Sequence, residues 1–284
     1  MRNLLSAGFT RLWRSKAFWL SCMFLAGQVC LALWTDFMDH KQLGIVRSID
    51  SCIFQFAMFL GLLMAVLCSL HLGTEYSDGT LRNKLIVGCK RRDIYVTNLI
   101  VLSTAAIVMC LSAIIPGLCM GVPLLGWFQM GTMKALVMMI GCLVLALCVT
   151  AILTLLSTLV TTRAVSAIVS LLMMLALMAV GVYSDSRLQA EPTITGMVIT
   201  TTDEAGNIDW GNSVIQETPN PLYLPDGPVR DIYEFIHDFT PGGQMMQYAS
   251  LSAQRPEMLI QYDAVIVIIT TAIGIYLFKR KDLR

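Results

Sequence analysis

Six long apolar runs limit what this chain can fold into. Each can cross roughly 30 Å of hydrocarbon as a helix that rises about 1.5 Å per residue. A membrane-spanning strand needs only about ten residues of alternating polarity, and these runs do not alternate. Because only 14% of the residues are charged, against about a quarter in soluble domains, the runs predict an all-α membrane protein with six transmembrane helices. They lie at Ala17–Thr35, Cys52–Leu72, Ile94–Ile115, Ala135–Leu159, Ala164–Tyr183 and Leu259–Phe278.

Charge is segregated between the segments that separate these runs. The basic residues are Arg2, Arg11, Arg14 and Lys16, then Arg82, Lys84, Lys90, Arg91 and Arg92, then Arg163, and finally Lys279, Arg280, Lys281 and Arg284. Acidic residues prevail in the intervening segments, at Asp36, Asp39 and Asp50 and from Asp185 to Asp263. Since basic loops stay in the cytoplasm, we expect a multi-pass protein of a bacterial plasma membrane with both termini cytoplasmic.

Two segments outside the six runs have sequence patterns of their own. One is the N-terminal segment, and the other precedes the last run. In residues 1–16, Leu5, Phe9, Leu12 and Trp13 share one helical face and Arg11 lies opposite, which is typical of an interfacial helix with Trp13 as its anchor. Residues 184–258 are long enough to form a small extracellular subdomain, followed by the sixth helix and basic tail in residues 259–284.

Within residues 184–258 the sequence predicts two short strands and one helix. Thr195–Thr202 alternates in polarity, residues 203–207 have a turn composition, and Ile208–Trp210 fits a returning strand. Val229–Phe239 has helical spacing with Pro228 in its first turn, and Pro241-Gly242-Gly243 ends it.

Catalytic and metal-binding motifs are missing from the sequence. It has no G-x-x-x-x-G-K-[ST] phosphate loop and no H-E-x-x-H zinc motif. His71 and Glu75 lie four residues apart, and we expect a hydrogen-bonded pair there, since two ligands do not make a metal site. The nine cysteines suggest free thiols. We therefore predict neither an enzyme nor a resident cofactor or metal.

Polar side chains inside the apolar runs are mostly amides and hydroxyls. The candidates for lining a translocation path are Gln28, Gln55, Thr150, Thr154 and Ser157. Small hydroxyl residues also serve tight helix packing, so the sequence leaves both interpretations open. Intramembrane acids and histidines of the kind that drive proton-coupled carriers are scarce in the runs, so the energy source is expected outside the chain.

The segment Glu75–Tyr95 concentrates charge and turn signals between two apolar runs. Ser77, Asp78 or Thr80 can cap a helix over Thr80–Val87, which Gly88 ends. A helix this short is marginal in water, and exposed leucines at positions 81 and 85 would suit a groove on another protein. The alternative is a basic loop with no further role.

This segment resembles the cytoplasmic loop of ABC-2 type permeases, the membrane subunits of one class of ATP-binding-cassette transporters. Their pattern is Glu-Tyr-x-x-Gly-Thr-[Ile/Leu]-[Arg/Lys]-x-Lys-Leu. The residues placed in the coupling loop, residues 73–93, are Glu75, Tyr76, Asp78, Gly79, Thr80, Leu81, Arg82, Lys84 and Leu85. Further similarities lie in Asn220-Pro221-x-Tyr223 and in the closing Tyr276-x-Phe278-Lys279-Arg280-Lys281.

The resemblance implies a partner and an energy source. Thr80–Val87 would be a coupling helix seated in a separate ATPase subunit that binds ATP and Mg, and residues 1–16 would be the elbow helix. A second permease subunit, identical or a sister chain, would complete the transporter in the lipid bilayer, with no role for nucleic acid. The expected activity is export of an apolar or amphipathic cargo, such as a peptide antibiotic, a lipid-like molecule or a drug.

The alternative is a membrane sensor or immunity protein that binds a peptide or lipid through its extracellular loop without transporting it. An ATPase encoded in an adjacent reading frame would favour the exporter. An intramembrane enzyme is disfavoured, because no paired acids, histidine cluster or activated nucleophile lies at helical spacing.

Overall fold

The computed structural model describes residues 1–44, 48–160, 162–198 and 214–281. Six helices are long and apolar enough to cross a membrane, and each contains one of the six predicted runs. The second of them is interrupted after its first turn, so that it consists of α3 and α4. The helices that form these spans are α2 (Lys16–Leu43), α3 (Asp50–Ile53), α4 (Phe56–Ser77), α6 (Arg91–Leu125), α7 (Thr132–Leu159), α8 (Arg163–Leu188) and α11 (Pro256–Arg280).

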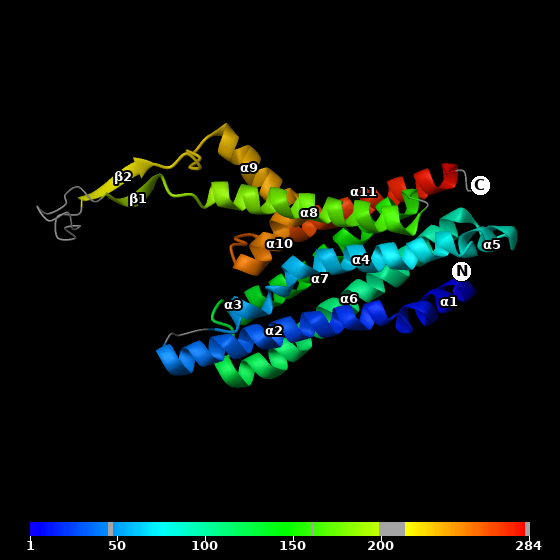
Figure 1. The fold of residues 1–284 in the computed structure, drawn as a ribbon, viewed down its shortest axis with the longest axis horizontal. Helices are drawn as coiled ribbons and strands as arrows, with labels where there is room; N and C mark the ends of the chain where they lie inside the picture. The colour runs from blue at the N-terminus through cyan, green and yellow to red at the C-terminus, as the bar shows by residue number, and fades with distance from the viewer. Residues whose placement is uncertain (45–47, 161, 199–213, 282–284) are drawn as a thin grey trace, which may run out of the picture.

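The long helices run alongside one another and give the molecule two distinct ends (Figure 1). The N-terminus, the short helix α5 (Thr80–Ile86) and the last turn of α11 lie together at one end, which we call the basic end. The other end, which we call the acidic end, carries the strands β1 (Thr193–Val198) and β2 (Val214–Pro219) and the helix α9 (Pro228–Phe239).

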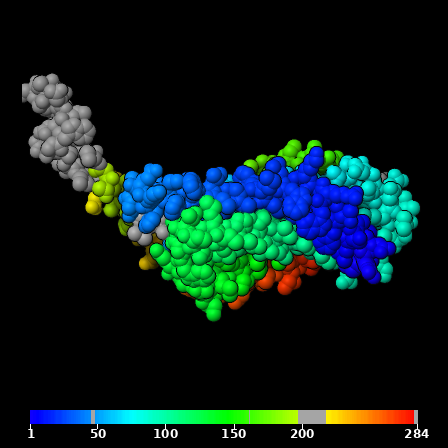
Figure 2. All heavy atoms as spheres, turned by 90° about the horizontal axis from the view of Figure 1, so that it is seen from below, coloured from blue at the N-terminus to red at the C-terminus, as the bar shows by residue number. Residues whose placement is uncertain are grey.

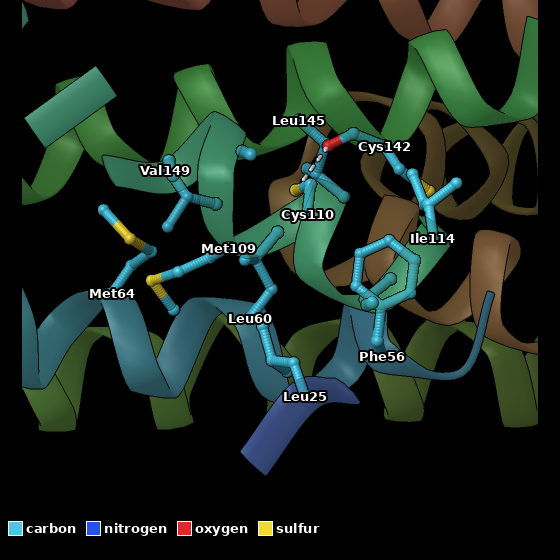
Figure 3. Close-up of a cluster of buried hydrophobic side chains, with 14 of the residues drawn as sticks. Leu25, Phe56, Leu60, Met64, Met109, Cys110, Ile114, Cys142, Leu145 and Val149 are labelled. Atoms are coloured by element: carbon cyan, nitrogen blue, oxygen red, sulfur yellow. Dashed lines mark hydrogen bonds between the residues drawn. The ribbon is translucent and has the colours of Figure 1, made fainter. Parts of the chain in front are cut away.

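Most of the core is one apolar cluster to which all the long helices contribute. Leu25 of α2, Leu60 of α4, Met109 of α6 and Leu145 of α7 are fully buried and lie close together (Figure 3). The thiol of Cys110 donates a weak hydrogen bond across 3.9 Å to the carbonyl of Cys142, which links α6 to α7. None of the nine cysteines, all of which lie in the described residues, forms a disulfide.

The N-terminal helix α1 (Arg2–Trp13) packs on α6. Gly8 lies against the side chain of Val101 with no room for a Cβ atom, and Leu12 is fully buried. Trp13 is 44% exposed, as an interfacial anchor requires, and its ring also contacts Phe18 and Trp19 of α2. Figure 2 shows α1 and α2 following one face of the molecule beside α6. The helix therefore serves tertiary packing as well as the interface expected for residues 1–16.

The helix α9 confirms the predicted helix over Val229–Phe239 and has Pro228 in its first turn. A second helix, α10 (Pro241–Ser250), follows directly and was not predicted. The hydroxyl of Thr240 accepts a hydrogen bond of 3.3 Å from the Gly243 amide and so caps it. The Pro-Gly-Gly sequence thus ends one helix and begins another.

Glycine residues allow α10 to pack closely against the long helix α8. A Cβ atom at Gly242 would overlap the carbonyl of Leu177, and one at Gly181 would overlap the backbone of Gly242. The backbones of α8 and α10 therefore touch. Part of residues 184–258 therefore belongs to the helical bundle, because α10 packs against α4, α7 and α8. The extracellular subdomain stays a prediction.

The helix α4 is unbroken from Phe56 to Ser77 and receives α10 near the acidic end. Because Gly61 has no side chain, the methyl groups of Met174 on α8 and Met245 on α10 can reach the α4 backbone. Both methionines are buried, so this contact is part of the core.

The strands β1 and β2 pair antiparallel, with Thr193 opposite Pro219. They project beyond the ends of the long helices (Figure 1). β1 overlaps the predicted strand over residues 195–202, whereas β2 was not predicted. The predicted turn at residues 203–207 and the strand Ile208–Trp210 lie outside the described residues.

Candidate functional site

A buried carboxylate at the basic end joins four helices. Glu75 lies in the last turn of α4, and its side chain is 1% exposed. Lys84 of α5 donates a hydrogen bond to Oε1, and the Asn98 amide of α6 donates to Oε2 across 3.0 Å. The Arg11 guanidinium of α1 lies 3.0 Å from Oε1, as an ion pair without hydrogen-bond geometry. Two cations and an amide thus compensate a charge that would be costly to bury alone. We call these four residues the Glu75 network.

The loop geometry around α5 places Lys84 in this network. Gly79 has a left-handed backbone with φ +66° and precedes the helix, and Gly88 with φ +90° follows it. The Thr80 hydroxyl donates to the Glu75 carbonyl across 3.2 Å and ties the start of α5 to the end of α4. Gly79 occupies the N-cap without a side-chain cap, so the expected capping by Ser77, Asp78 or Thr80 was wrong.

The two leucines of α5 face the protein's own helices. Leu81 is 3% exposed and packs with Ile94 and Tyr95 of α6 and Phe278 of α11. Leu85 is partly buried against the same group. The expectation of leucines exposed for a partner was therefore wrong for Leu81. Their spacing places them on one face, but it does not reveal that the basic ends of α6 and α11 cover that face.

The exposed surface of α5 carries different side chains. Arg82 and Asn83 are exposed, and Ile86 and Val87 are 74% and 83% exposed at the end of the helix. Exposure of two adjacent apolar side chains to water is unfavourable, because the free energy that their burial would contribute is lost. Ile86 and Val87 lie outside the candidate membrane spans.

The end of α11 is fastened to the same region. The Tyr76 hydroxyl donates to the carbonyl of Thr158 across 2.6 Å, and the ammonium of Lys281 donates to this carbonyl across 2.7 Å. Lys281 also lies over the Tyr76 ring, 4.5 Å from its centroid. Arg91, at the start of α6, donates to the carbonyl of Lys281. Burial lowers the pKa of Lys281 to about 8.

The expected pair between His71 and Glu75 does not form. His71 is buried, and its Nε2 has no hydrogen-bond partner among the described residues. Both Glu75 oxygens are taken by Lys84 and Asn98. Sequence spacing identified the helix face correctly, but it could not show that partners from other helices would occupy the carboxylate.

The five residues proposed to line a path lie in separate places. Gln55 donates to the Ser51 carbonyl across 2.7 Å, in the break between α3 and α4. Thr150 and Ser157 are fully buried in α7, where Thr150 donates to the Ala146 carbonyl across 2.7 Å. Ser157 lies 3.4 Å from the hydroxyl of Ser170 on α8, which favours a packing role.

The other two path candidates have unpaired polar atoms. Thr154 Oγ1, which is fully buried, and Gln28 Oε1 have no hydrogen-bond partner in the described part of the chain. Neither residue lines the cavity at the acidic end. Path lining remains a prediction for all five residues.

The acidic end contains a polar cavity of about 300 Å³ that the sequence analysis missed. It lies between the ends of α8, α9, α10 and α11 and is lined by Asp185, Arg230, His237, Asp238, Gln247, Arg255 and Leu259, among others. The buried His237 has Nδ1 3.0 Å from the Ser184 hydroxyl and Nε2 3.5 Å from Asp185. Burial lowers its pKa, against smaller opposing effects of Asp185 and Asp238. The imidazole is therefore neutral at pH 7.

Comparison with known proteins identifies the family. The chain gives no match to a curated protein. The model of a family described as ABC-2 family transporter protein matches residues 4–181. This match spans more than half of the chain and contains most of α1, the Glu75 network, α5 and the helices through most of α8. The chain belongs to the ABC-2 family of transporter proteins and is a membrane-embedded permease subunit.

Proposed function

We propose that this permease exports an apolar or amphipathic cargo with ATP hydrolysed by a separate ATPase subunit that binds α5. The observation that carries the proposal is the exposure of Ile86 and Val87 on a helix whose other face is fixed by Leu81 and the Glu75 network. A surface that is rigidly held and has apolar side chains at its tip suits a protein partner, because little conformational entropy is lost when the partner binds.

The Glu75 network supports coupling between the partner and the membrane. Lys84 connects α5 to Glu75 at the end of α4, and Arg11 and Asn98 extend the contact to α1 and α6. A displacement of α5 would therefore move two spanning helices and the N-terminal helix together.

The proposal extends to the rest of the transporter. ATP and Mg would be bound by the ATPase, and a second permease, identical or a sister chain, would face this one in the bilayer. Family membership implies the ATPase and the membrane. The orientation with α5 and both termini in the cytoplasm rests on the segregation of basic residues.

The test is co-purification of the permease with the ABC ATPase encoded beside it. We expect the double variant Ile86→Asp, Val87→Asp to insert and fold but to lose the ATPase. The matched control is Val229→Asp, Ile232→Asp on α9, where both side chains are 57% exposed at the opposite end. Retention of the ATPase by the α5 variant would refute docking on this surface.

Transport supplies the second measurement. Vesicles that contain the permease and its ATPase should accumulate cargo in their lumen only with ATP, and the α5 variant should not. A wild-type permease that neither binds an ATPase nor moves cargo would favour the sensor or immunity protein instead.

A further inference from the structure

A carboxylate is buried in α11, where its polar neighbours are the Cys148 thiol of α7 and the Gln244 side chain of α10. Asp263 is 0% exposed, and neither Oδ1 nor Oδ2 has a hydrogen-bond partner among the described residues. Asp263 is expected above among the acidic residues of the outer segment, although it lies within the last span. That assignment was wrong, because Asp263 lies inside the apolar run Leu259–Phe278 itself, in the second turn of α11 rather than in the segment before it. A charged group without a partner in this setting is strongly disfavoured and marks a functional site by default.

Two side chains of α10 have unpaired oxygen atoms in the same region. Gln244 and Tyr248 are fully buried, and neither Gln244 Oε1 nor the Tyr248 hydroxyl has a partner in the described part of the chain. Gln244 uses its amide nitrogen to donate to the Asp238 carbonyl across 2.9 Å, so its oxygen is the free end. Gln244 lies beside Asp263. The unpaired atoms are thus three acceptors and one hydroxyl, and they call for a group rich in hydrogen-bond donors.

The polar cavity at the acidic end is lined in part by residues of the same two helices, α10 and α11. Gln247 of α10 and Leu259 of α11 line it. Gln244 precedes Gln247 by three residues, and Asp263 follows Leu259 by four, so each shares a helix face with a lining residue. The free acceptors therefore lie about one helical turn from the cavity lining.

The charges around the cavity favour a cation. Asp185 and Asp238 contribute carboxylates to its lining, and His237 between them is kept neutral by burial. Arg230 is paired with carboxylates of its own segment. Arg255 is exposed to solvent.

We propose that Asp263, Gln244 and Tyr248 bind a primary ammonium group that enters through this cavity. Such a group carries one positive charge and three donors, which matches the carboxylate and the free amide oxygen. The identification of its bearer as the exported cargo, such as a lysine-containing peptide or an alkylamine, rests on the proposed function.

Binding exchanges one cation for another. Without ligand Asp263 holds a proton, because an unpaired carboxylate is too costly at this depth. When the ammonium arrives, the O–H bond of the carboxyl group breaks, the proton passes to the aqueous phase, and the carboxylate pairs with the ammonium. The titratable groups that face Asp263 are Cys142 and Cys148 of α7 and Tyr248 of α10.

The experiment uses the full chain in lipid nanodiscs and decylammonium as the probe. Binding above partition into empty nanodiscs is measured by equilibrium dialysis, with decyltrimethylammonium as a probe of equal charge and no donors. We expect saturable binding of the primary ammonium and at least about thirtyfold weaker binding to Asp263→Asn, as for a truncated buried charge pair. Glu257→Gln, an exposed acid in the first turn of α11, is the control and should bind like the wild type.

Infrared spectroscopy supplies a readout that does not depend on affinity. The carbonyl band of a protonated carboxylic acid should be present without probe, disappear with decylammonium and be absent from Asp263→Asn. Equal binding of both probes, wild-type binding by Asp263→Asn, or a band that decylammonium leaves unchanged would each overturn the proposal. Because no ATPase is present, these results are independent of whether α5 docks on one.

Discussion

The Arg11 guanidinium lies 3.0 Å from the Glu75 carboxylate, which joins the N-terminal helix to the end of α4. The same carboxylate holds Lys84 of α5. One acid therefore sets the positions of the two short helices that precede and follow the first two spans.

Neutralising this acid should loosen the basic end. We expect Glu75→Gln to lower the free energy of unfolding by about 1–3 kcal/mol, less than the about 3–5 kcal/mol for a fully buried pair, because Arg11 and Lys84 are 35% and 21% exposed. Denaturant titration in mixed micelles measures it. Asp78→Asn, an exposed acid three residues later, should change stability little. Equal stability of the two variants would remove Glu75 from the centre of the network.

Leu81 and Ile86 separate the inner face of α5 from its outer face. Leu81→Ala should cost about 2–5 kcal/mol of unfolding free energy, because it opens a cavity among Ile94, Tyr95 and Phe278. Ile86→Ala, at a side chain 74% exposed, should stay within about 0.5 kcal/mol of the wild type. The same titration compares them. A larger loss for Ile86→Ala would show that the leucine face is not the structural one.

Lys281 should make the basic end more stable at alkaline pH. Burial lowers its pKa from the usual 10.5 to about 8, so the unfolded chain binds this proton more tightly than the folded one. Stability contributed by Lys281 therefore rises between pH 8 and 10.5. Lys281→Met should flatten that rise in thermal unfolding, whereas Lys279→Met, an exposed neighbour, should not. An unchanged rise in Lys281→Met would assign it to another group.

His237 should make the packing of α9 on α8 sensitive to acid. Burial lowers its pKa below the usual 6.5, so the folded state binds the proton less well than the unfolded one. The contribution is complete above pH 6.5 and declines as the pH falls below it. Amide exchange in α9 should accelerate at pH 5 relative to pH 7, and His237→Gln should reduce the difference. Exchange in His237→Gln that still depends on pH to the same extent would contradict this.

Cys89 tests the orientation on which the proposed function relies. In a background without the other cysteines, a membrane-impermeant maleimide should label Cys89 only after the cells are permeabilised. Asp226→Cys, at a side chain 99% exposed on the acidic end, should be labelled in intact cells. The reverse result would invert the topology.

The features that sequence predicts here are those with a local cause. Apolar length predicts the six spans, Pro228 predicts the start of α9, and Gly88 predicts the end of α5. Each of these features depends on residues next to it in the chain, so each can be predicted without knowing which other helices pack against it.

The features that escaped prediction depend on distant partners. Gly242 and Gly243 read as helix breakers, yet they start α10, because contact with the α8 backbone and with the carbonyl of His237 requires residues without side chains. The sequence predicts Leu81 as a docking residue, because it does not show that Phe278 of α11 covers this side chain. Asp263 reads as one more acid of the outer segment, because its burial depends on α7 and α10.

The unbroken course of α4 has a mechanical consequence. Gly61 and Glu75 sit roughly 20 Å apart on one stiff rod, at about 1.5 Å per residue. A tilt of about 10° pivoting at Glu75 sweeps Gly61 through roughly 3–4 Å. The rod's far end rests on the Met174 and Met245 side chains, and methionine is the most compliant of the apolar residues. Helix α4 can therefore tilt as a rigid body, because the methionine side chains at its far end can change conformation. Such a tilt passes movement to α10 without breaking a backbone hydrogen bond.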